Sequence, residues 1–302
     1  MSGSGRRPTL VVVGANGQVG HELVRELAPL GETVGLTRAE CELERPEDAA
    51  RAVAALRPAV VVNAGAYTAV DRAESDAERC RVVNALAPRA LAAAAAECGA
   101  AFVHYSTDYV FNGEKPDPYT EDDAPDPRGV YGATKLEGER LALDANPATV
   151  VFRTSWVYAT RGHNFLRTML RLARERDELR VVADQRGAPT WARAIAAATA
   201  QAVGAGLRAP NGAAAWAAER RGVVHLTAGG ATTWHGFAEA ILALDPRRDE
   251  QRAARVVPIA TADYPTSARR PANSVLDNAR LEEWFGLRLP DWRAQLALAL
   301  AG

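Results

Sequence analysis

Cysteine is scarce in this sequence, and the few cysteines stand far apart. Cys41, Cys80 and Cys98 are the three among 302 residues, and none belongs to a CxxC pair. An odd number at wide spacing excludes a disulfide framework and favours the reduced thiols of a cytosol. The five histidines form no HExxH motif, so the sequence gives no support to a metal site.

Long apolar runs and an excess of one charge are also lacking. The apolar run at residues 10–13 stops at Gly14, far too early for a signal peptide, and no segment has the length and apolarity of a membrane span. The 36 Lys and Arg balance 37 Asp and Glu, which attracts neither nucleic acid nor an anionic membrane surface. We therefore expect a cytoplasmic protein with no nucleic-acid or membrane partner, and interpret residues 1–8 as a leader outside the fold.

Short apolar runs alternate with helical patterns through the first half of the chain. The expected strands are residues 10–13, 33–37, 59–63, 101–106 and 148–153, and the expected helices are residues 19–28, 46–56, 76–98 and 130–144. Unbroken apolar strands that alternate with helices predict a parallel sheet covered on both faces. Pro88 should kink or split the third helix.

The second half is less regular and predicts a smaller lobe. Residues 204–222, rich in Ala, Gly and Arg, are expected to be an exposed linker. The other expected elements are strands at residues 180–183 and 223–227 and helices at 164–176, 191–203, 234–244, 278–285 and 291–300. The fold class is therefore α/β: a Rossmann-type doubly wound parallel sheet with a smaller C-terminal α/β lobe.

A glycine-rich turn, Gly14-Ala-Asn16-Gly17-Gln-Val-Gly20, joins the first strand to the first helix. Glycines at such a turn let the backbone approach a pyrophosphate, and the helix N-terminus offers free N–H groups. The spacing is GxxGxxG, not the commoner GxGxxG, and glycines also simply tighten turns. Its place in a βαβ unit is what favours dinucleotide binding.

The end of the second strand bears on which dinucleotide is bound. It reads Leu36-Thr37-Arg38, where an NAD-specific site usually places an acid on the ribose 2′-OH. A guanidinium can pair with a 2′-phosphate, although Arg38 also fits a plain surface arginine. Glu42 and Leu43 follow and could flank the adenine. We predict NADPH as the cofactor, with NADH also accepted.

Thr107, Tyr131 and Lys135 form a candidate catalytic group. Tyr131 and Lys135 open a helix at i, i+4 spacing and so share one helix face, and Thr107 ends the fourth strand. A nearby ammonium favours the phenolate and lowers a pKa that is ordinarily near 10. A hydroxyl at the strand end can hold a carbonyl against the phenol, which supplies the proton when a nicotinamide supplies hydride. YxxxK alone is common by chance, but its order after the glycine turn and Thr107 favours this function.

This order resembles the extended short-chain dehydrogenase/reductase superfamily, and within it the dTDP-4-dehydrorhamnose reductase family. The matching stretches cover residues 9 to about 300 and are Gly14-Ala-Asn-Gly-Gln-Val-Gly20, Val62-Asn-Ala-Gly-Ala-Tyr-Thr-Ala-Val-Asp71, Ser106-Thr-Asp-Tyr-Val-Phe111, Tyr131-Gly-Ala-Thr-Lys-Leu-Glu-Gly-Glu139, Arg153-Thr-Ser-Trp-Val-Tyr158, Asp184-Gln-Arg-Gly-Ala-Pro-Thr190 and Arg270-Pro-Ala-Asn-Ser274.

The resemblance implies roles for the matching residues. Tyr131 would donate the proton to the C4 oxygen of a nucleotide sugar, and Lys135 would hold the nicotinamide ribose. Thr107, Asp108 and Trp156 would contact the sugar, although Trp156 also suits ordinary core packing. Gly17, Gln18 and Val19 would cradle the pyrophosphate, and the other expected cofactor-binding residues are Gly14, Asn16, Gly20, Arg38, Glu42, Leu43, Ala66, Tyr67, Thr68 and Tyr105.

The sheet-rich first half and the irregular second half suggest a cofactor domain followed by a substrate lobe. Residues 1–157 should form the NAD(P)-binding domain, completed by strands near 180–183 and 223–227, and residues 158–302 mainly the substrate lobe. Some relatives pair through metal-bridged carboxylates. Here Glu22 keeps one acid while Arg193 and Arg293 stand at the others, so no metal is expected. The expected partner is a small nucleotide-sugar substrate, and the protein is a monomer or a homodimer.

Several functions remain open at this point. Related dehydratases have Thr-Asp-Glu where this chain has Tyr109, which disfavours loss of water. The sugar could be the rhamnose precursor or a related keto or aldehyde sugar of an antibiotic pathway. A non-catalytic NADP-binding regulatory subunit is a further alternative, disfavoured by the presence of both Tyr131 and Lys135.

A loop rich in proline and acids, residues 112–129, joins Thr107 to Tyr131. We expect a solvated rim whose part near Tyr119 folds over the sugar while the carboxylates face water. A permanently disordered connector is the alternative on composition.

Overall fold

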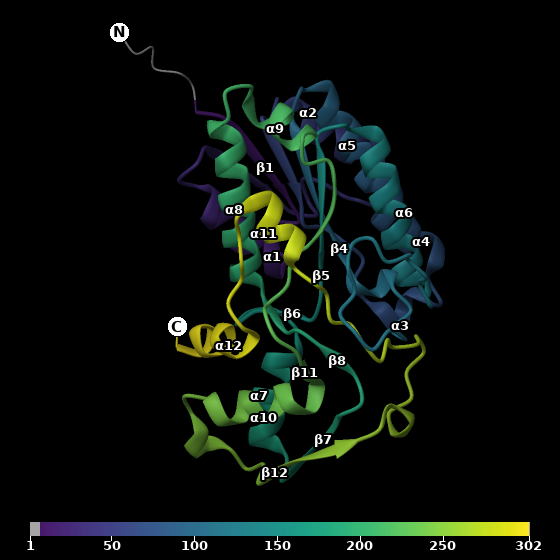
Figure 1. Ribbon diagram of the computed structural model, residues 1–302, viewed down its shortest axis with the longest axis vertical. Helices are drawn as coiled ribbons and strands as arrows, with labels where there is room; N and C mark the ends of the chain where they lie inside the picture. The colour runs from purple at the N-terminus through teal and green to yellow at the C-terminus, as the bar shows by residue number, and fades with distance from the viewer. Residues whose placement is uncertain (1–6, 302) are drawn as a thin grey trace.

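A six-stranded parallel sheet forms the centre of the larger lobe in this computed structural model, which describes residues 7–301 (Figure 1). The strand order is β10-β5-β4-β3-β1-β2. The strands are β1 (Thr9–Val13), β2 (Glu32–Leu36), β3 (Val60–Asn63), β4 (Ala101–Thr107), β5 (Thr149–Thr154) and β10 (Gly222–His225). The expected doubly wound parallel sheet is thereby confirmed.

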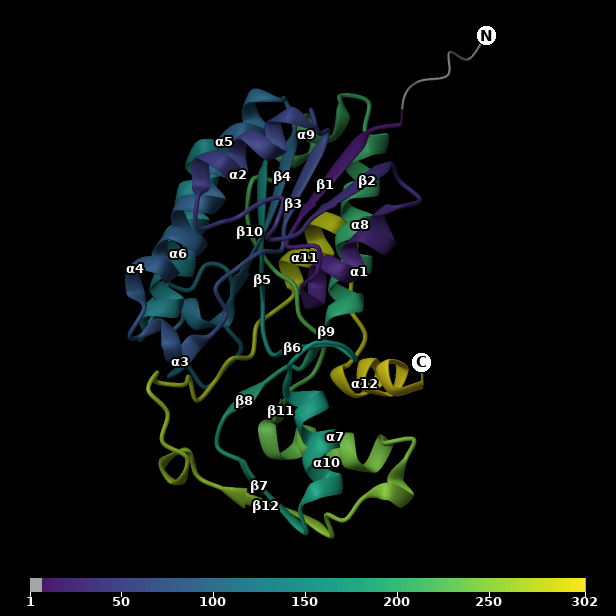
Figure 2. The same ribbon diagram turned by 180° about the vertical axis from the view of Figure 1, so that it is seen from behind.

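Both faces of the sheet are covered, because its central strands β1 and β3 direct apolar side chains toward both faces. Along β1, Leu10 and Val12 join one core cluster while Val11 and Val13 join the other. The first cluster is closed by α1 (Gln18–Leu27), α8 (Ala192–Arg208), α9 (Gly212–Ala218) and α11 (Ala279–Phe285), and the second by α2 (Pro46–Ala55), α5 (Ala87–Glu97) and α6 (Val130–Ala145). Figure 2 shows the two helical layers on either side of the sheet.

A π-helical turn just before Pro88 interrupts the third expected helix. That helix consists of α4 (Ala77–Arg81), a π-helical turn (Val82–Leu86) and α5, with Pro88 in the first turn of α5. A proline is tolerated in a first turn because the N–H that it lacks has no partner there. The short helix α3 (Val70–Ala73) precedes α4.

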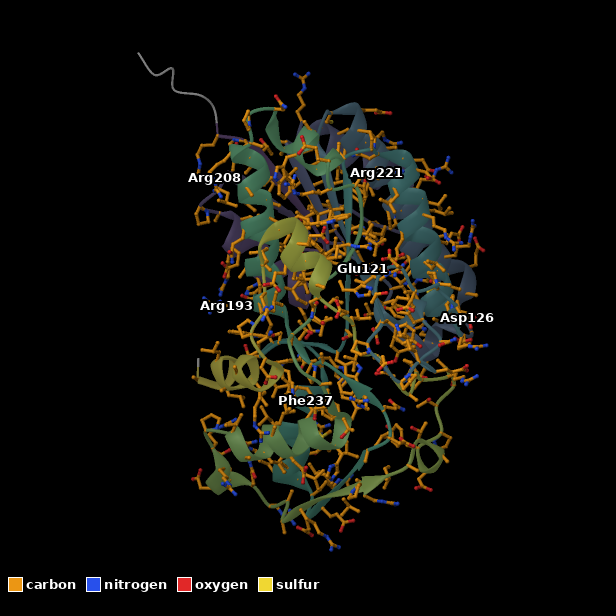
Figure 3. All side chains as sticks on the ribbon, viewed as in Figure 1. Glu121, Asp126, Arg193, Arg208, Arg221 and Phe237 are labelled. Atoms are coloured by element: carbon orange, nitrogen blue, oxygen red, sulfur yellow. The ribbon has the colours of Figure 1, made fainter. Side chains whose placement is uncertain are left out.

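A second, smaller lobe is built from short paired strands and three helices (Figure 1). Its elements are β6 (Val157–Tyr158), α7 (Phe165–Glu175), β7 (Glu178–Val182), β8 (Arg186–Gly187), β9 (Thr190–Trp191), β11 (Thr232–Thr233), α10 (Trp234–Leu244), β12 (Arg255–Ile259) and α12 (Trp292–Ala301). Phe237 lies in its core with Leu166, Ile241 and Leu296 (Figure 3). Short 3-10 turns lie at Asp108–Val110, Arg248–Glu250 and Thr261–Asp263.

The chain crosses between the lobes more than once. The strand expected near residues 223–227 is β10, and it does complete the central sheet beside β5. The prediction that a strand near residues 180–183 also joins that sheet is wrong. That strand, β7, pairs with β12, because its apolar residues Leu179 and Val181 pack in the core of the smaller lobe.

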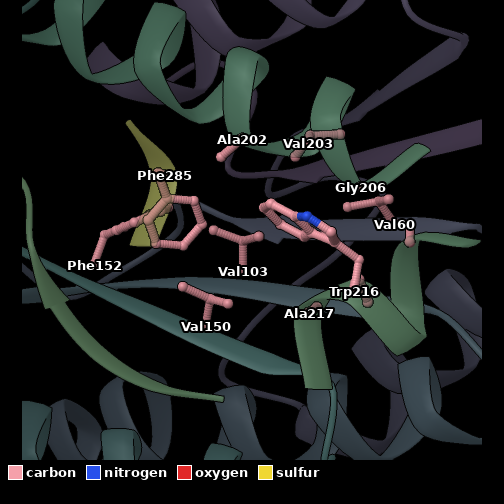
Figure 4. A pocket seen from close by; sticks show the side chains of 12 residues that line it. Val60, Val103, Val150, Phe152, Ala202, Val203, Gly206, Trp216, Ala217 and Phe285 are labelled. Carbon is pink, nitrogen blue, oxygen red and sulfur yellow. The ribbon is translucent and has the colours of Figure 1, made fainter. Parts of the chain in front are cut away.

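The prediction that residues 204–222 form an exposed linker is also wrong. Helix α8 continues to Arg208, and α9 begins four residues later. Trp216 packs edge-on against Phe285 with ring centroids 5.5 Å apart, and Ala217 is buried, so both line a small apolar cavity against the sheet (Figure 4). An alanine-rich segment has high helix propensity, and its small side chains make room for the indole.

The loop at residues 112–129 is pinned to the C-terminal segment, so the alternative of a permanently disordered connector is wrong, whereas Glu114, Asp117, Asp122 and Asp126 face water as expected. Tyr119 is buried, stacks on Phe111 at 4.3 Å between ring centroids, and donates its backbone N–H to the oxygen of Val275. The buried Glu121 carboxylate accepts the backbone N–H of His225, whereas Asp126 lies at the periphery (Figure 3). Burial among aromatic rings, rather than composition, determines the path of this loop.

Residues 1–8 were expected to be a leader outside the fold, and residues 1–6 of this segment lie outside the described residues. Arg7 and Pro8 belong to the fold, since the Arg7 guanidinium donates to the oxygen of Ala28 and the Pro8 oxygen accepts the N–H of Glu32. Between residues 7 and 301, no helix combines the length and apolarity that crossing a membrane requires.

Candidate active site

The glycine turn leaves the start of α1 open to a ligand. Gly14 has a φ of 79°, and a Cβ there would come within 2.7 Å of the backbone nitrogen of Gly65. A Cβ at Gly20 would overlap the carbonyl oxygen of Gly14, so this glycine permits the close packing of α1 on the turn. Gly17 caps α1 without a side-chain acceptor, which leaves first-turn N–H groups available to an anion.

A pocket of about 670 Å³ opens beside this turn, over the carboxyl ends of β1, β3 and β4. Ligands of open α/β sheets bind at this edge, and the volume suits a cofactor. The pocket brings together every expected cofactor-binding residue except Gly20, namely Gly14, Asn16, Gly17, Gln18, Val19, Arg38, Glu42, Leu43, Ala66, Tyr67, Thr68, Tyr105, Tyr131 and Lys135. The glycine cradle and the open helix end both fit a dinucleotide pyrophosphate.

Arg38 lies at the rim of this pocket, where it is free to turn. Its side chain is 72% exposed, and its Nε lies 3.9 Å from a carboxylate oxygen of Glu42, which makes a loose ion pair. Such an exposed pair contributes little to stability. The guanidinium can therefore exchange this partner for a phosphate at small cost.

Lys135 is buried and is held by β4. Its ammonium donates to the backbone oxygen of Tyr105 at 2.5 Å and lies 3.2 Å from Nε2 of His104. Burial lowers the pKa of Lys135 to about 8, partly offset by the negative charge of Glu139. Burial also lowers the pKa of His104 well below its ordinary value, so that imidazole stays neutral. His104 gave no signal in the sequence, because a histidine inside an apolar strand is usually a core residue.

Tyr131 lies one helical turn before Lys135, on the pocket wall. Its ring meets that of Tyr109 edge to face, with centroids 5.5 Å apart. Burial raises the pKa of the Tyr131 phenol, and Thr107 opposes part of that rise. The sequence predicts that Lys135 lowers this pKa; in the structure burial raises it, so the phenol carries its proton at neutral pH.

Thr107 and Asp108 are buried at the end of β4. The Thr107 hydroxyl donates to a carboxylate oxygen of Asp108 at 2.9 Å and accepts the backbone N–H of Tyr109. Burial raises the pKa of Asp108 to about 6, although the hydroxyls of Ser274 and Thr107 favour its charged form. Ser274 belongs to a sequence motif that carried no role until the structure placed it beside Asp108.

Trp156 adopts a backbone conformation that is rare for its residue type. Its φ is 48°, and its indole stacks on that of Trp234 with centroids 3.6 Å apart and planes 7° from parallel. A Cβ at Gly187 would overlap the indole, so glycine is required there. Strained residues of this kind concentrate at functional sites. The described residues that line the large pocket do not include the three expected sugar contacts, Thr107, Asp108 and Trp156.

Some pocket residues were missed by the sequence reading. Arg72 and Arg79 add positive charge, with Arg79 held by Glu44 and placed over the Tyr67 ring. Gly162 and His163 reach the pocket from the smaller lobe, and no local pattern could have assigned them. Among residues 7–301, no cluster of three or more His, Cys, Asp or Glu side chains has metal-binding geometry.

Comparison with known proteins bears on this site. A family model described as the RmlD substrate binding domain matches residues 8–302. The dTDP-4-dehydrorhamnose reductase of Burkholderia thailandensis is 53% identical over 294 residues, 96% of this chain and 97% of that protein. The Salmonella typhimurium reductase is 45% identical, with 94% of each chain covered. The solved structure of the Bacillus anthracis reductase in complex with NADP has a TM-score of 0.87 at 30% identity, covering 98% of this chain and 99% of that one.

The sheet, the glycine turn and the Tyr131–Lys135 pair beside a dinucleotide-sized pocket define an NADP-dependent oxidoreductase of the extended short-chain type. The matches extend over nearly the whole chain and nearly the whole length of the relatives. The chain belongs to the dTDP-4-dehydrorhamnose reductase family. The resemblance drawn from sequence motifs is thereby confirmed.

Proposed function

We propose that this protein transfers hydride from NADPH to the C4 keto group of a dTDP-4-keto-6-deoxy sugar, as a dTDP-4-dehydrorhamnose reductase. The observation that carries the proposal is the placement of the Tyr131 phenol on the wall of the cofactor pocket, with the Thr107 hydroxyl next to it. The 53% and 45% identical relatives, which carry this name, support the substrate class.

Each residue of the site has one task in this reaction. The nicotinamide, when bound, supplies the hydride. Tyr131 donates its proton to the oxygen that was the keto group, and its raised pKa keeps that proton in place until charge develops on the substrate. Lys135 holds the nicotinamide ribose by its ammonium, and Thr107 orients the keto oxygen toward the phenol. Asp108 and Trp156 bind the sugar.

Different residues bind different parts of the cofactor. The start of α1, with Gly17, Gln18 and Val19, binds the pyrophosphate, and Arg38 pairs with the 2′-phosphate. Residues 7–156 form the cofactor domain together with β10 and with α8, α9 and α11, which cover one face of its sheet. The remaining smaller lobe binds most of the sugar nucleotide. The protein acts as a monomer or a homodimer, which sedimentation of the pure protein distinguishes.

The decisive experiment incubates the protein with NADPH and dTDP-4-keto-6-deoxy-L-mannose and identifies the product by NMR. Oxidation of NADPH with formation of dTDP-L-rhamnose is the expected result, and the Tyr131→Phe variant is the matched control. Turnover of another keto or aldehyde sugar nucleotide, and not of this one, would assign a related pathway. NADPH binding with no turnover of any of them would make the protein a regulatory subunit.

A further inference from the structure

A loop of the smaller lobe, residues 159–164, meets the glycine turn of the larger lobe. The link is Asn164, whose side-chain nitrogen donates to Oε1 of Gln18 at 2.9 Å. The same nitrogen also contacts the backbone oxygens of Ala159 at 2.8 Å and Arg161 at 2.9 Å. The two hydrogens of this NH₂ group thus serve three acceptor oxygens, so one hydrogen is shared between two of the oxygens. Gln18 is the first residue of α1, so this contact fixes the side chain at the helix end proposed to bind pyrophosphate.

The loop between these anchors forms part of the pocket. Gly162 and His163 both line it, opposite the glycine turn. Gly162 has a φ of 70°, and a Cβ there would come within 3.8 Å of the Gln18 side chain. The Gly162 oxygen accepts from the Arg167 guanidinium at 2.8 Å, so the loop is held from α7 as well.

The side-chain oxygen of Asn164 has a separate, structural role. Its oxygen accepts the backbone N–H of Arg167 at 3.1 Å and so caps α7. One residue therefore combines a helix cap, which any short polar side chain can provide, with a contact to Gln18, which needs the length and the donor of an asparagine. The two tasks can be separated by substitution.

We propose that residues 160–163 form the outer wall of the cofactor's pyrophosphate site, with His163 contacting the pyrophosphate, and that Asn164 is the positioning residue that couples this wall to Gln18. The inference rests on the proposed use of a nicotinamide dinucleotide and is independent of which sugar is reduced. Because NADPH and NADH share the pyrophosphate, the wall acts on both equally, unlike Arg38.

The test is a titration of the full-length protein with NADPH and with NADH, without sugar. Serine at 164 keeps the cap but cannot reach Gln18, so Asn164→Ser should weaken both cofactors by about fivefold to tenfold, the effect of one or two hydrogen bonds. His163→Ala should also weaken both to a similar extent. Dissociation constants within twofold of wild type for either variant would overturn the corresponding part of the proposal.

Two further variants separate positioning from general damage. Thr233→Ala removes the cap of α10, where the Thr233 hydroxyl oxygen accepts the N–H of Gly236, and should leave both dissociation constants unchanged. In a Gln18→Ala background, Asn164→Ser should have much less effect than in wild type, since the shared contact is already gone. Effects that multiply independently would show that Asn164 does not act through Gln18. A loss confined to NADPH for His163→Ala would place His163 at the 2′-phosphate. Because the titration contains no sugar, its result is distinguishable from failure of the proposed reductase activity.

Discussion

The ammonium of Lys135 lies 3.2 Å from Nε2 of His104, with both side chains buried. Neutral His104 and the Tyr105 oxygen are the groups on β4 that hold this ammonium, while Glu139 lies one turn further along α6 in a buried ion pair with Arg153. Another titratable group that acts on Lys135 is the thiol of Cys80 on α4. Lys135 is therefore positioned before the cofactor arrives, and its charge depends on pH near neutrality.

Cofactor capture should decline as Lys135 loses its proton. Burial lowers the pKa of Lys135 to about 8, so the ammonium is present below that pH and is lost as pH rises through it. We expect kcat/KM for NADPH, which reports the free enzyme, to fall through this range. Lys135→Arg should keep its charge and move the fall to higher pH. A profile that stays level through pH 8 in wild type would contradict the role of the ammonium.

Tyr131→Phe should separate chemistry from binding. Only the phenolic proton is lost, so kcat should drop by roughly a hundredfold to ten-thousandfold, the usual contribution of a general acid, while the dissociation constant for NADPH stays near that of wild type. Steady-state kinetics with a fluorescence titration of NADPH measures both. Activity within a few-fold of wild type would remove Tyr131 from the mechanism.

Arg38→Ala should change the preference between cofactors. The exposed Arg38 side chain has only a loose contact with Glu42, which leaves it available to the 2′-phosphate. Losing a charge-assisted bond should lower kcat/KM for NADPH by roughly tenfold or more and leave that for NADH nearly unchanged. The measurement is the ratio of the two constants in each protein. An unchanged ratio would make Arg38 a plain surface residue.

His225 should make the fold sensitive to mild acid. It is buried under the loop at residues 112–129, against Phe111, and burial lowers its pKa to about 3. The pKa of His225 in the folded protein lies below its unfolded value of 6.5. The contribution of neutral His225 to the unfolding free energy is therefore complete above pH 6.5 and is lost as the pH falls toward 3. Between pH 7 and pH 5, wild type should lose about 2 kcal/mol more unfolding free energy than His225→Gln.

Urea unfolding of both proteins at the two pH values gives this difference directly. The comparison with His225→Gln is needed because Asp108 also titrates in this range. Burial raises the pKa of Asp108 to about 6, so protonation of Asp108 increases the unfolding free energy of both proteins equally as the pH falls. Equal losses in the two proteins would show that His225 accepts a proton without unfolding.

The sequence predicts those parts of the site that lie at the ends of strands. The glycine turn follows β1, Arg38 follows β2 and Thr107 ends β4, and parallel strands bring these ends to one edge whatever the rest of the chain does. Tyr131 and Lys135 follow from helical spacing alone. The pocket accordingly collects nearly all the residues expected to bind a cofactor.

The sequence does not reveal contacts that depend on packing between distant segments. Trp156 and Trp234 stack across many residues of intervening chain, and Asn164 reaches Gln18 from another lobe. Residues 204–222 looked like a linker because Ala and Gly suit both helices and loops, and only Trp216 reveals which is formed. The apolar run of β7 predicts a strand but contains nothing that selects β12 over β5 as its partner.

The late position of β10 has a consequence for how the protein is made. Its strand is the sixth of the central sheet, yet it leaves the ribosome only after the whole of α7, α8 and α9 has been translated. Until then β5 is an unprotected edge with the apolar sequence Thr149–Thr154, which is open to pairing with other nascent chains. Synthesis therefore passes through a stage at which β5 is the edge of the sheet, and termination after residue 154 but before residue 222 leaves that edge without its partner strand.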